Sequence, residues 1–320
     1  MKLFEHPDFD QAIIRAAEHF RARGLRESII EKDYYVTEAL RILEESAGEF
    51  VIFKGGTSLS RGWGLIERFS EDIDIFLDPA AFIPPLGKRA IDRELKKLTG
   101  AVGKHAALTF VKSESQTIGG FGRNDRFEYV QKFAGVGDIR NRVFIEIGTA
   151  SGRQPTERIR LQSYVAQFLA ETGVSLGAED EAPFEMRLLH FRRTFVEKLF
   201  AIHAKVENFK RIGTPIGGYA RHYYDLYCLA DQPEVAEMLA SDEYRAIKAD
   251  YDQISRASFP QSYVPPPGMM FADSDAIFPP PELSAALSTE YETQCEVLCF
   301  GQFPAWRDVR ARLESIRNLI

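Results

Sequence analysis

A short apolar strand that runs into a double glycine constrains the fold of this chain more than any other feature. Residues 50–53 (Phe-Val-Ile-Phe) form an apolar run that stops at Lys54, and a helical segment can start at Ser58. This order predicts a buried strand, a tight turn and a helix N-terminus. Glycines let the backbone approach a phosphate closely, and a helix N-terminus adds N–H donors. The segment Gly55-Gly56-Thr57-Ser58 is therefore a candidate phosphate-binding turn, to which Ser58 can add a hydroxyl donor.

A second strand is predicted at residues 72–77, where Asp72 and Asp74 alternate with Ile73 and Ile75. Side chains two residues apart on a strand share a face, so the carboxylates lie on one side and the isoleucines face the core. Like charges this close repel unless a cation neutralises them. Mg²⁺ suits the pair because it prefers oxygen ligands and bridges carboxylates to substrate phosphates. Together the two motifs indicate nucleotidyl transfer, whereas either one alone is more typical of an ordinary turn or a solvated strand edge.

The chain resembles the AbiEii/AbiGii-type toxin nucleotidyltransferases of the polymerase-β-like superfamily. Four ordered segments carry the resemblance: IIEKDYYVTEAL (29–40), FKGGTSLSRGWGLIERFSEDIDIFL (53–77), FVEKLFAIHAK (195–205) and RHYYDLYCL (221–229). It implies an α+β fold with a nucleotidyltransferase core, a small mixed sheet with helices, followed by a mainly helical C-terminal domain. It also implies metal-binding Asp72 and Asp74, a phosphate-binding turn at 55–58, a helical Lys198 and a late Asp225.

Sites of the polymerase-β-like kind commonly add a third acid from a neighbouring strand. Residues 143–147 (Val-Phe-Ile-Glu-Ile) offer Glu146 within an otherwise apolar strand. A carboxylate in such a strand is paired, bound to metal or at the surface. Glu146 is therefore a candidate third metal ligand, and the alternative is an outward-facing glutamate beside Arg140 or Arg142.

Lys198 lies on a predicted helix over residues 187–209. The apolar face of that helix consists of Leu188, Phe191, Phe195, Leu199 and Ile202. Lys198 is nearly in register with this face, so its ammonium is partly desolvated and favours an anion such as a triphosphate. The alternative is a lysine that extends along apolar surface to water.

Asp225 and Arg221 are four residues apart and can form an ion pair on one helix face. Aromatic neighbours also leave room for Asp225 to orient Lys198 or a nucleotide group, and the resemblance favours this role. Near the N-terminus, Lys32 and Asp33 belong to a charged cluster beside an amphipathic helix pattern. Such a cluster is usually solvated, and the resemblance offers the alternative that both residues support the active site.

The net charge of −7 argues against a protein that coats nucleic acid with its whole surface. Between residues 187 and 222, however, eight basic residues are opposed by only Glu197 and Glu207. This stretch is either a surface that holds an RNA backbone or an ordinary charged helix face.

The 320 residues are enough for two substantial domains. We expect a nucleotidyltransferase core with N-terminal helices at 1–150 and a mainly helical domain at 151–320, with a Pro-rich arm at 258–283. Strands are expected near 50–54, 72–77, 107–113, 127–133 and 142–148. The three cysteines favour reduced thiols. No run of about twenty apolar residues is present and the N-terminus is polar, so we expect a cytoplasmic protein without membrane contact.

The predicted mechanism is in-line transfer of NMP from an NTP. Asp72 and Asp74, with Glu146 as third ligand, hold Mg²⁺, while Gly55, Gly56, Ser58 and Lys198 assist the departure of pyrophosphate. The resemblance implies the tRNA 3′ end as acceptor, and a growth-inhibiting toxin that a cognate antitoxin relieves. Open alternatives are transfer to a protein hydroxyl, a regulator that binds NTP without transfer, and a metal-dependent nuclease that would not need the glycine turn.

Overall fold

The computed structural model describes residues 1–70, 72–134 and 141–320. Contacts divide the chain into two compact units. The core unit comprises Met1–Trp63, Ser70–Thr149 and Thr156–Leu189, and the helical unit comprises Gly64–Phe69, Ala150–Pro155 and His190–Ile320. Residues 156–189, which sequence patterns placed with the helical part of the chain, thus lie with the core unit because two strands within them extend its sheet.

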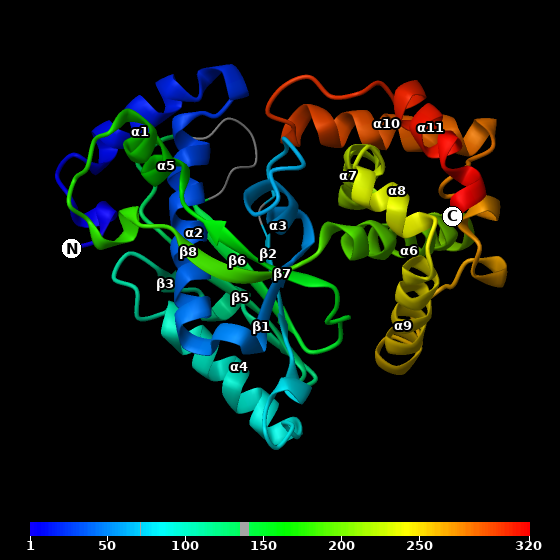
Figure 1. Ribbon diagram of the computed structural model, residues 1–320, viewed down its shortest axis with the longest axis horizontal. Helices are drawn as coiled ribbons and strands as arrows, with labels where there is room; N and C mark the ends of the chain where they lie inside the picture. Colours follow the sequence, from blue (N-terminus) through cyan, green and yellow to red (C-terminus); the bar gives the residue numbers. More distant parts are fainter. Residues whose placement is uncertain (71, 135–140) are drawn as a thin grey trace. The chain divides into compact units, whose positions relative to one another are not determined.

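The described residues of the core unit form one eight-stranded mixed sheet (Figure 1). Its strands run in the order β3-β5-β6-β2-β1-β8-β7, and β4 pairs with β5. Their bounds are β1 (Val51–Lys54), β2 (Asp72–Leu77), β3 (Thr109–Phe110), β4 (Gln116–Ile118), β5 (Gly122–Glu128), β6 (Arg142–Gly148), β7 (Thr156–Leu161) and β8 (Phe184–Leu189). The mixed α+β fold that the sequence predicts is confirmed.

Three predicted strands lie where the sequence places them, at β1, β2 and β6. The other two predictions were wrong in extent. The strand expected at 107–113 is only the two residues of β3, and the strand expected at 127–133 is β5, which begins at Gly122. Gly119 and Gly120 have φ values of +57° and +76° and form the turn between β4 and β5, so β5 starts directly after a hairpin turn that Gly makes accessible.

The sheet has one apolar face, which α2 (Glu27–Ala47) and α4 (Lys88–Val102) contact. Ile73, Ile75 and Ile145 are buried on this face, as the alternation along β2 and β6 predicts. Asp125 on β5 shares their face and accepts a hydrogen bond from Thr99 of α4. The core unit also contains α1 (Phe9–His19), α3 (Gly55–Arg61) and α5 (Tyr164–Thr172).

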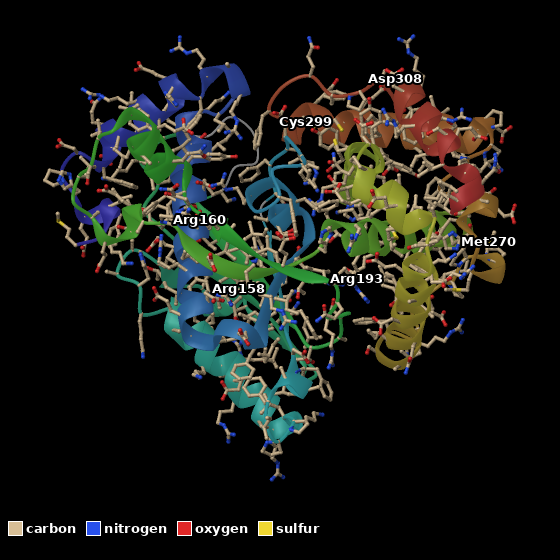
Figure 2. The ribbon with its side chains drawn as sticks, viewed as in Figure 1. Arg158, Arg160, Arg193, Met270, Cys299 and Asp308 are labelled. Carbon is tan, nitrogen blue, oxygen red and sulfur yellow. The ribbon has the colours of Figure 1, made fainter. Side chains whose placement is uncertain are left out.

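The edge strand β7 carries charged side chains. Arg158 and Arg160 are exposed, and both are labelled in Figure 2. Arg158 donates a 2.9 Å hydrogen bond to the Glu44 carboxylate. Charged residues on an edge strand hinder pairing with another chain.

The helical unit is built from α6 (Phe191–Ile212), α7 (Arg221–Ala230), α8 (Pro233–Leu239), α9 (Asp242–Ser258), α10 (Pro281–Leu298) and α11 (Trp306–Ser315). The helix predicted at 187–209 begins later, because residues 187–189 end β8 and His190 caps α6 by accepting a hydrogen bond from the Arg192 N–H. Within the Pro-rich segment 258–283, the residues between α9 and α10 contain only short 3₁₀ turns as regular structure, and Phe271 is fully buried against Phe200. None of the described helices has the length and apolarity needed to cross a membrane.

Candidate active site

The glycine turn and the acidic strand meet in the core unit. Gly55 begins α3 directly after β1, and its φ of +75° lies in the left-handed region that favours glycine. A Cβ on Gly55 would overlap the Asp74 carboxylate. The turn and Asp74 are therefore in close contact, and this position admits no side chain without displacing one of them.

Polar side chains form a row across four strands on the face opposite the isoleucines. Asp74 is the register partner of Lys54 on β1 and of Glu146 on β6, and Glu146 is in turn opposite Asn124 on β5. Register partners project to the same face, so Lys54, Asp74, Glu146 and Asn124 line one side of the sheet. Asp72 lies on this face two residues before Asp74. The sheet thus collects both charges of the acid pair and Glu146 on a single surface.

Glu146 has a defined neighbour in this row. The Asn124 side-chain amide donates a 3.4 Å hydrogen bond to its carboxylate. Of the two arginines that the sequence offers as partners, Arg142 donates to Glu128 and Glu114, and Arg140 lies outside the described residues. Asn124 is a residue that sequence reasoning missed, because the register between β5 and β6 is not visible in either strand alone.

Hydroxyl groups fix the turn. The Thr57 hydroxyl donates a 2.5 Å hydrogen bond to the main-chain carbonyl of Asp72 and so connects α3 to the start of β2. The Ser58 hydroxyl donates to the Gly55 carbonyl at 2.9 Å, and the Ser58 side chain is fully buried. Before Ser58 could donate to a phosphate, it would have to give up this bond. The first N–H groups of α3 have no partner within the helix, which leaves Gly55 and Gly56 as the residues whose backbone suits a phosphate.

The acid pair fits magnesium that arrives with a nucleotide. Among residues 1–70, 72–134 and 141–320, no group of three or more His, Cys, Asp or Glu side chains is arranged to hold a metal ion. Mg²⁺ needs no such group, since one or two carboxylates together with substrate phosphates and waters commonly hold it. Asp72 and Asp74 supply two carboxylates on one face, and Glu146 remains a predicted third ligand.

A Gly55→Ala substitution tests the contact between the turn and Asp74. The methyl group meets the Asp74 carboxylate and a left-handed backbone, so we expect a loss of about 3 kcal/mol in the free energy of unfolding and at least tenfold slower turnover. Gly173 is the matched control because its φ is +67° and its Cβ position has nothing within 4 Å. Gly173→Ala should cost about 1 kcal/mol and leave turnover unchanged. Equal losses in the two variants, measured by urea unfolding, would contradict the contact.

Asp33 contacts the C-terminal end of α3. Its carboxylate accepts hydrogen bonds from the Tyr164 N–H at 2.7 Å and lies 2.5 Å from Nε of Arg61, the last residue of α3. Lys32 and Asp33 are both buried, so the solvated alternative for this charged pair is wrong. Arg61, which the sequence did not single out, connects Asp33 to the helix that begins with the candidate phosphate-binding turn.

Lys198 and Asp225 lie together in the helical unit. Nζ of Lys198 on α6 is 2.7 Å from the Asp225 carboxylate on α7, so these two candidate residues are in contact. The second partner of Asp225 is Arg68, whose Nε and Nη2 donate at 2.6 and 2.7 Å. Arg68 and Asp225 are 1% and 0% exposed. Sequence reasoning missed Arg68, because its partner is 157 residues away and no local spacing connects the two.

Charge fixes the protonation of this buried cluster. The guanidinium of Arg68 and the ammonium of Lys198 outweigh the effect of burial and hold the pKa of Asp225 well below its usual value. Burial lowers the pKa of Lys198, and the Asp225 carboxylate opposes that shift. His222 lies 3.1 Å from Nζ of Lys198 through Nδ1, and burial with the neighbouring Lys198 charge lowers its pKa to about 3. The imidazole is therefore neutral at pH 7.

The pKa of His222 predicts a loss of stability in acid. An unfolded histidine takes up a proton near pH 6.5, whereas folded His222 does not until about pH 3. The unfolded state therefore binds more protons in this window, and the free energy of unfolding falls as pH falls through it, by about 1.4 kcal/mol per pH unit. In His222→Asn, the Asn oxygen can still accept from Lys198. Urea unfolding at pH 6.5 and at pH 4 measures how far the free energy of unfolding falls between them, and this fall should be smaller by about 2–3 kcal/mol in the variant than in the wild type. Parallel curves would contradict the assigned pKa.

The basic stretch from 187 to 222 is partly neutralised by acids from outside it. Arg192 pairs with Glu243 at 3.3 Å, Arg193 (Figure 2) with Asp250 at 2.5 Å, and Lys210 with Asp275 at 2.7 Å. For Arg192 and Lys210 the ordinary charged helix face is the better interpretation, and Arg193 is buried rather than part of a surface. The three cysteines are free thiols, as predicted.

The chain is similar to known proteins over most of its length. The family described as "Nucleotidyl transferase AbiEii toxin, Type IV TA system" matches residues 39–312. Among solved structures, MenT4, a nucleotidyltransferase toxin from Mycobacterium tuberculosis H37Rv, is similar in fold with a TM-score of 0.50 and 16% sequence identity. The match covers 96% of this chain and 99% of that one. No curated protein matches the chain.

Proposed function

Since the chain belongs to the AbiEii family of nucleotidyl transferase toxins of type IV toxin–antitoxin systems, we propose that it transfers NMP from an NTP to the 3′ end of tRNA with the help of Mg²⁺. The chain is a nucleotidyltransferase, and the observation that supports this site for the reaction is the contact between Gly55 and the Asp74 carboxylate. It puts a turn suited to phosphate beside an acid suited to the metal that accompanies phosphate.

Each candidate residue has its own role in the proposed transfer. Asp72 and Asp74, with Glu146, would hold the metal, which neutralises phosphate charge and lowers the pKa of the acceptor hydroxyl. The N–H groups of Gly55 and Gly56 bind the triphosphate, and Thr57 keeps the turn against β2 through its bond to the Asp72 carbonyl. The acceptor oxygen attacks the α-phosphorus in line, and the bond to the leaving pyrophosphate breaks. Lys198, oriented by Asp225, neutralises the charge that develops on the pyrophosphate.

The acceptor is the part of the proposal that most needs a test. The family supports a toxin with an NTP substrate and an antitoxin partner. The tRNA acceptor is the finer part of the proposal, and its support is the sequence resemblance described above. A protein hydroxyl is the second candidate, and the neutralised charges of Arg192, Arg193 and Lys210 favour it because they weaken the case for an RNA-binding surface.

A competition experiment separates the two acceptors. Purified protein is incubated with Mg²⁺, each of the four α-labelled NTPs in turn, total tRNA and a tRNA-free extract of cellular protein in one tube. Denaturing gels should show label in the tRNA band, and the NTP that labels it gives the base preference. Label confined to protein bands would overturn the tRNA clause while leaving nucleotidyl transfer intact. Absence of label from every acceptor would favour an NTP-binding regulator.

A further inference from the structure

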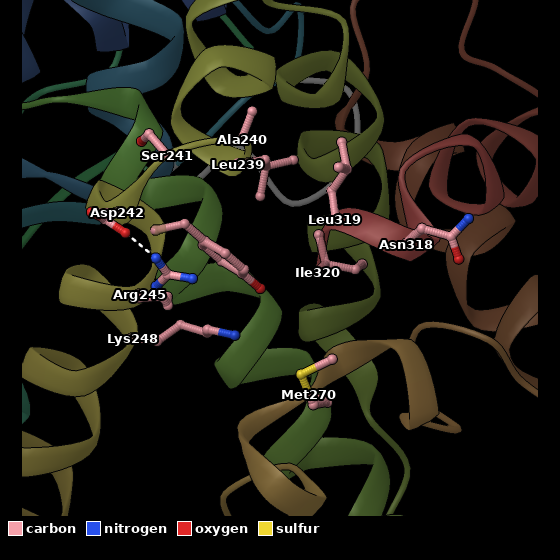
Figure 3. A pocket seen from close by; sticks show the side chains of 11 residues that line it. Leu239, Ala240, Ser241, Asp242, Arg245, Lys248, Met270, Asn318, Leu319 and Ile320 are labelled. Carbon is pink, nitrogen blue, oxygen red and sulfur yellow. Dashed lines mark hydrogen bonds and ion pairs between the residues drawn. The ribbon is translucent and has the colours of Figure 1, made fainter.

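A cavity of about 450 Å³ opens within the helical unit, and Figure 3 shows side chains that line it. Lys198 and Asp225 are not among its lining residues. The cavity lies between the end of α8, the first turns of α9, Met270 of the Pro-rich segment and residues 318–320. Its size falls in the range of pockets that bind small organic ligands. Two polar side chains on α9, one charged and one neutral, indicate that this cavity is a binding site.

Lys248 is the charged group. Its side chain is 9% exposed, and Nζ donates one hydrogen bond, of 2.9 Å, to the Met269 carbonyl. Nζ also lies 4.2 Å from the centre of the Tyr244 ring. No ion pair with a described carboxylate accompanies these contacts, and the nearby charge is the like charge of Arg245. A buried ammonium without a counter-charge is unfavourable unless an anion joins it.

Tyr244 is the neutral group. It lines the same cavity, is 4% exposed, and its buried hydroxyl has no hydrogen-bond partner among the described residues. Buried hydroxyls almost always have a partner, so this one indicates an acceptor that a ligand would bring. The main chain that accepts the Lys248 hydrogen bond is strained, because Met269 has a φ of +60°.

The rest of the lining sets the shape of a ligand. Leu239, Met270 and Leu319 supply apolar surface, and the last two are 47% and 43% exposed. At the rim, Arg245 pairs with Asp242 of the same helix turn, as the dashed line in Figure 3 marks. This pair leaves Lys248 as the cation of the interior. An anionic head and an apolar body therefore match the two parts of the cavity.

We propose that this cavity binds a small organic anion, whose phosphate or carboxylate contacts Lys248 and Tyr244 and whose apolar part packs against Leu239, Met270 and Leu319. The phosphate or carboxylate accepts hydrogen bonds from the Lys248 ammonium and the Tyr244 hydroxyl. No bond is made or broken in the ligand. The proposal does not depend on the acceptor of the nucleotidyl transfer, and either can fail without the other.

Calorimetric titration of the full chain tests the proposal with three probes of one shape. Phenyl phosphate and benzoate carry the two anionic heads, and benzyl alcohol carries none. We expect one saturable site for at least one of the anions, and binding at least about tenfold weaker for benzyl alcohol, as the loss of a charge-assisted hydrogen bond implies. Which anion binds more tightly distinguishes a phosphate ligand from a carboxylate ligand.

Variants locate the site. Lys248→Met keeps the apolar stem and should weaken binding of the preferred anion about tenfold, and Tyr244→Phe should weaken it about threefold. Lys210→Met is the control, because Lys210 is an exposed lysine of the same unit that pairs with Glu207 and Asp275. Thermal unfolding confirms that each variant is folded, and Tyr244→Phe keeps the test open if Lys248→Met does not fold. Absence of saturable binding by both anions up to about 10 mM, or equal affinities of the wild type and the folded variants, would overturn the proposal.

Discussion

An Asp74→Asn protein should release pyrophosphate from NTP about 10³-fold more slowly than the wild type, in the presence of Mg²⁺ and tRNA. Asn has the size of Asp, so it fits the space beside Gly55, but it lacks the charge that a divalent metal needs. Asp72→Asn should show a loss of the same order. The measurement is a coupled pyrophosphate assay at saturating nucleotide, with the free energy of unfolding measured on the same preparations.

The control for this prediction is Asp92→Asn. Asp92 lies on α4 of the same unit and pairs with Lys96 at 2.6 Å. The Asp92→Asn variant therefore removes one carboxylate and leaves the acidic face of the sheet unchanged. Its turnover should stay within a factor of two of the wild type. If Asp74→Asn retained turnover as the control does, Asp74 would have no part in holding the metal.

Asp225→Asn should be the most destabilising single change in the helical unit. Asp225 is fully buried and shares its carboxylate between Arg68 and Lys198. Removing the carboxylate leaves two buried cations without a counter-charge, and such a loss costs about 3–5 kcal/mol. Urea unfolding at pH 7 measures it. The low pKa of Asp225 also predicts a loss of stability in acid. At a pH below the ordinary carboxyl pKa of 3.8, the unfolded state is protonated at this position, so the free energy of unfolding falls as pH falls further.

Two further variants calibrate this result. Asp308→Asn removes an exposed carboxylate that lies 3.4 Å from Arg307, and its effect should stay below about 1 kcal/mol. Lys198→Met keeps the pair between Arg68 and Asp225, so it should destabilise the protein less than Asp225→Asn does while still slowing transfer. An Asp225→Asn protein as stable as Asp308→Asn would show that the buried cluster contributes little to folding.

Local patterns predicted the centre of the sheet correctly. The alternation of Asp72, Ile73, Asp74 and Ile75 defines a two-faced strand, and the register of β2 with β6 places Asp74 opposite Glu146. The two faces of β2 depend on a period of two residues, which is visible within a few positions, whereas the register that puts Asp74 opposite Glu146 is seen only in the folded sheet. The association of Lys198 with Asp225 came from the family resemblance, since the two residues lie on different helices.

Features that depend on distant partners were not predictable from local patterns. β7 and β8 lie in the stretch 151–320 that we expected to be mainly helical, and β8 joins the sheet by parallel pairing with β1, far away in the sequence. Arg68 belongs to an irregular stretch, and only the fold shows that it holds the Asp225 carboxylate. The burial of Asp33 depends in the same way on Arg61 and on the N–H of Tyr164. Tertiary pairing of this kind leaves no periodic trace in the chain.

The most direct test of NMP transfer to the 3′ end of tRNA compares two positions of the label. Wild-type protein, Mg²⁺ and tRNA are incubated with NTP labelled at either the α- or the γ-phosphate, and a parallel sample contains tRNA whose 3′-terminal ribose has been oxidised by periodate. We predict that α-label enters intact tRNA, that γ-label does not, and that oxidised tRNA takes up neither. Uptake of γ-label, or undiminished α-labelling of the oxidised tRNA, would contradict nucleotidyl transfer to the 3′ end.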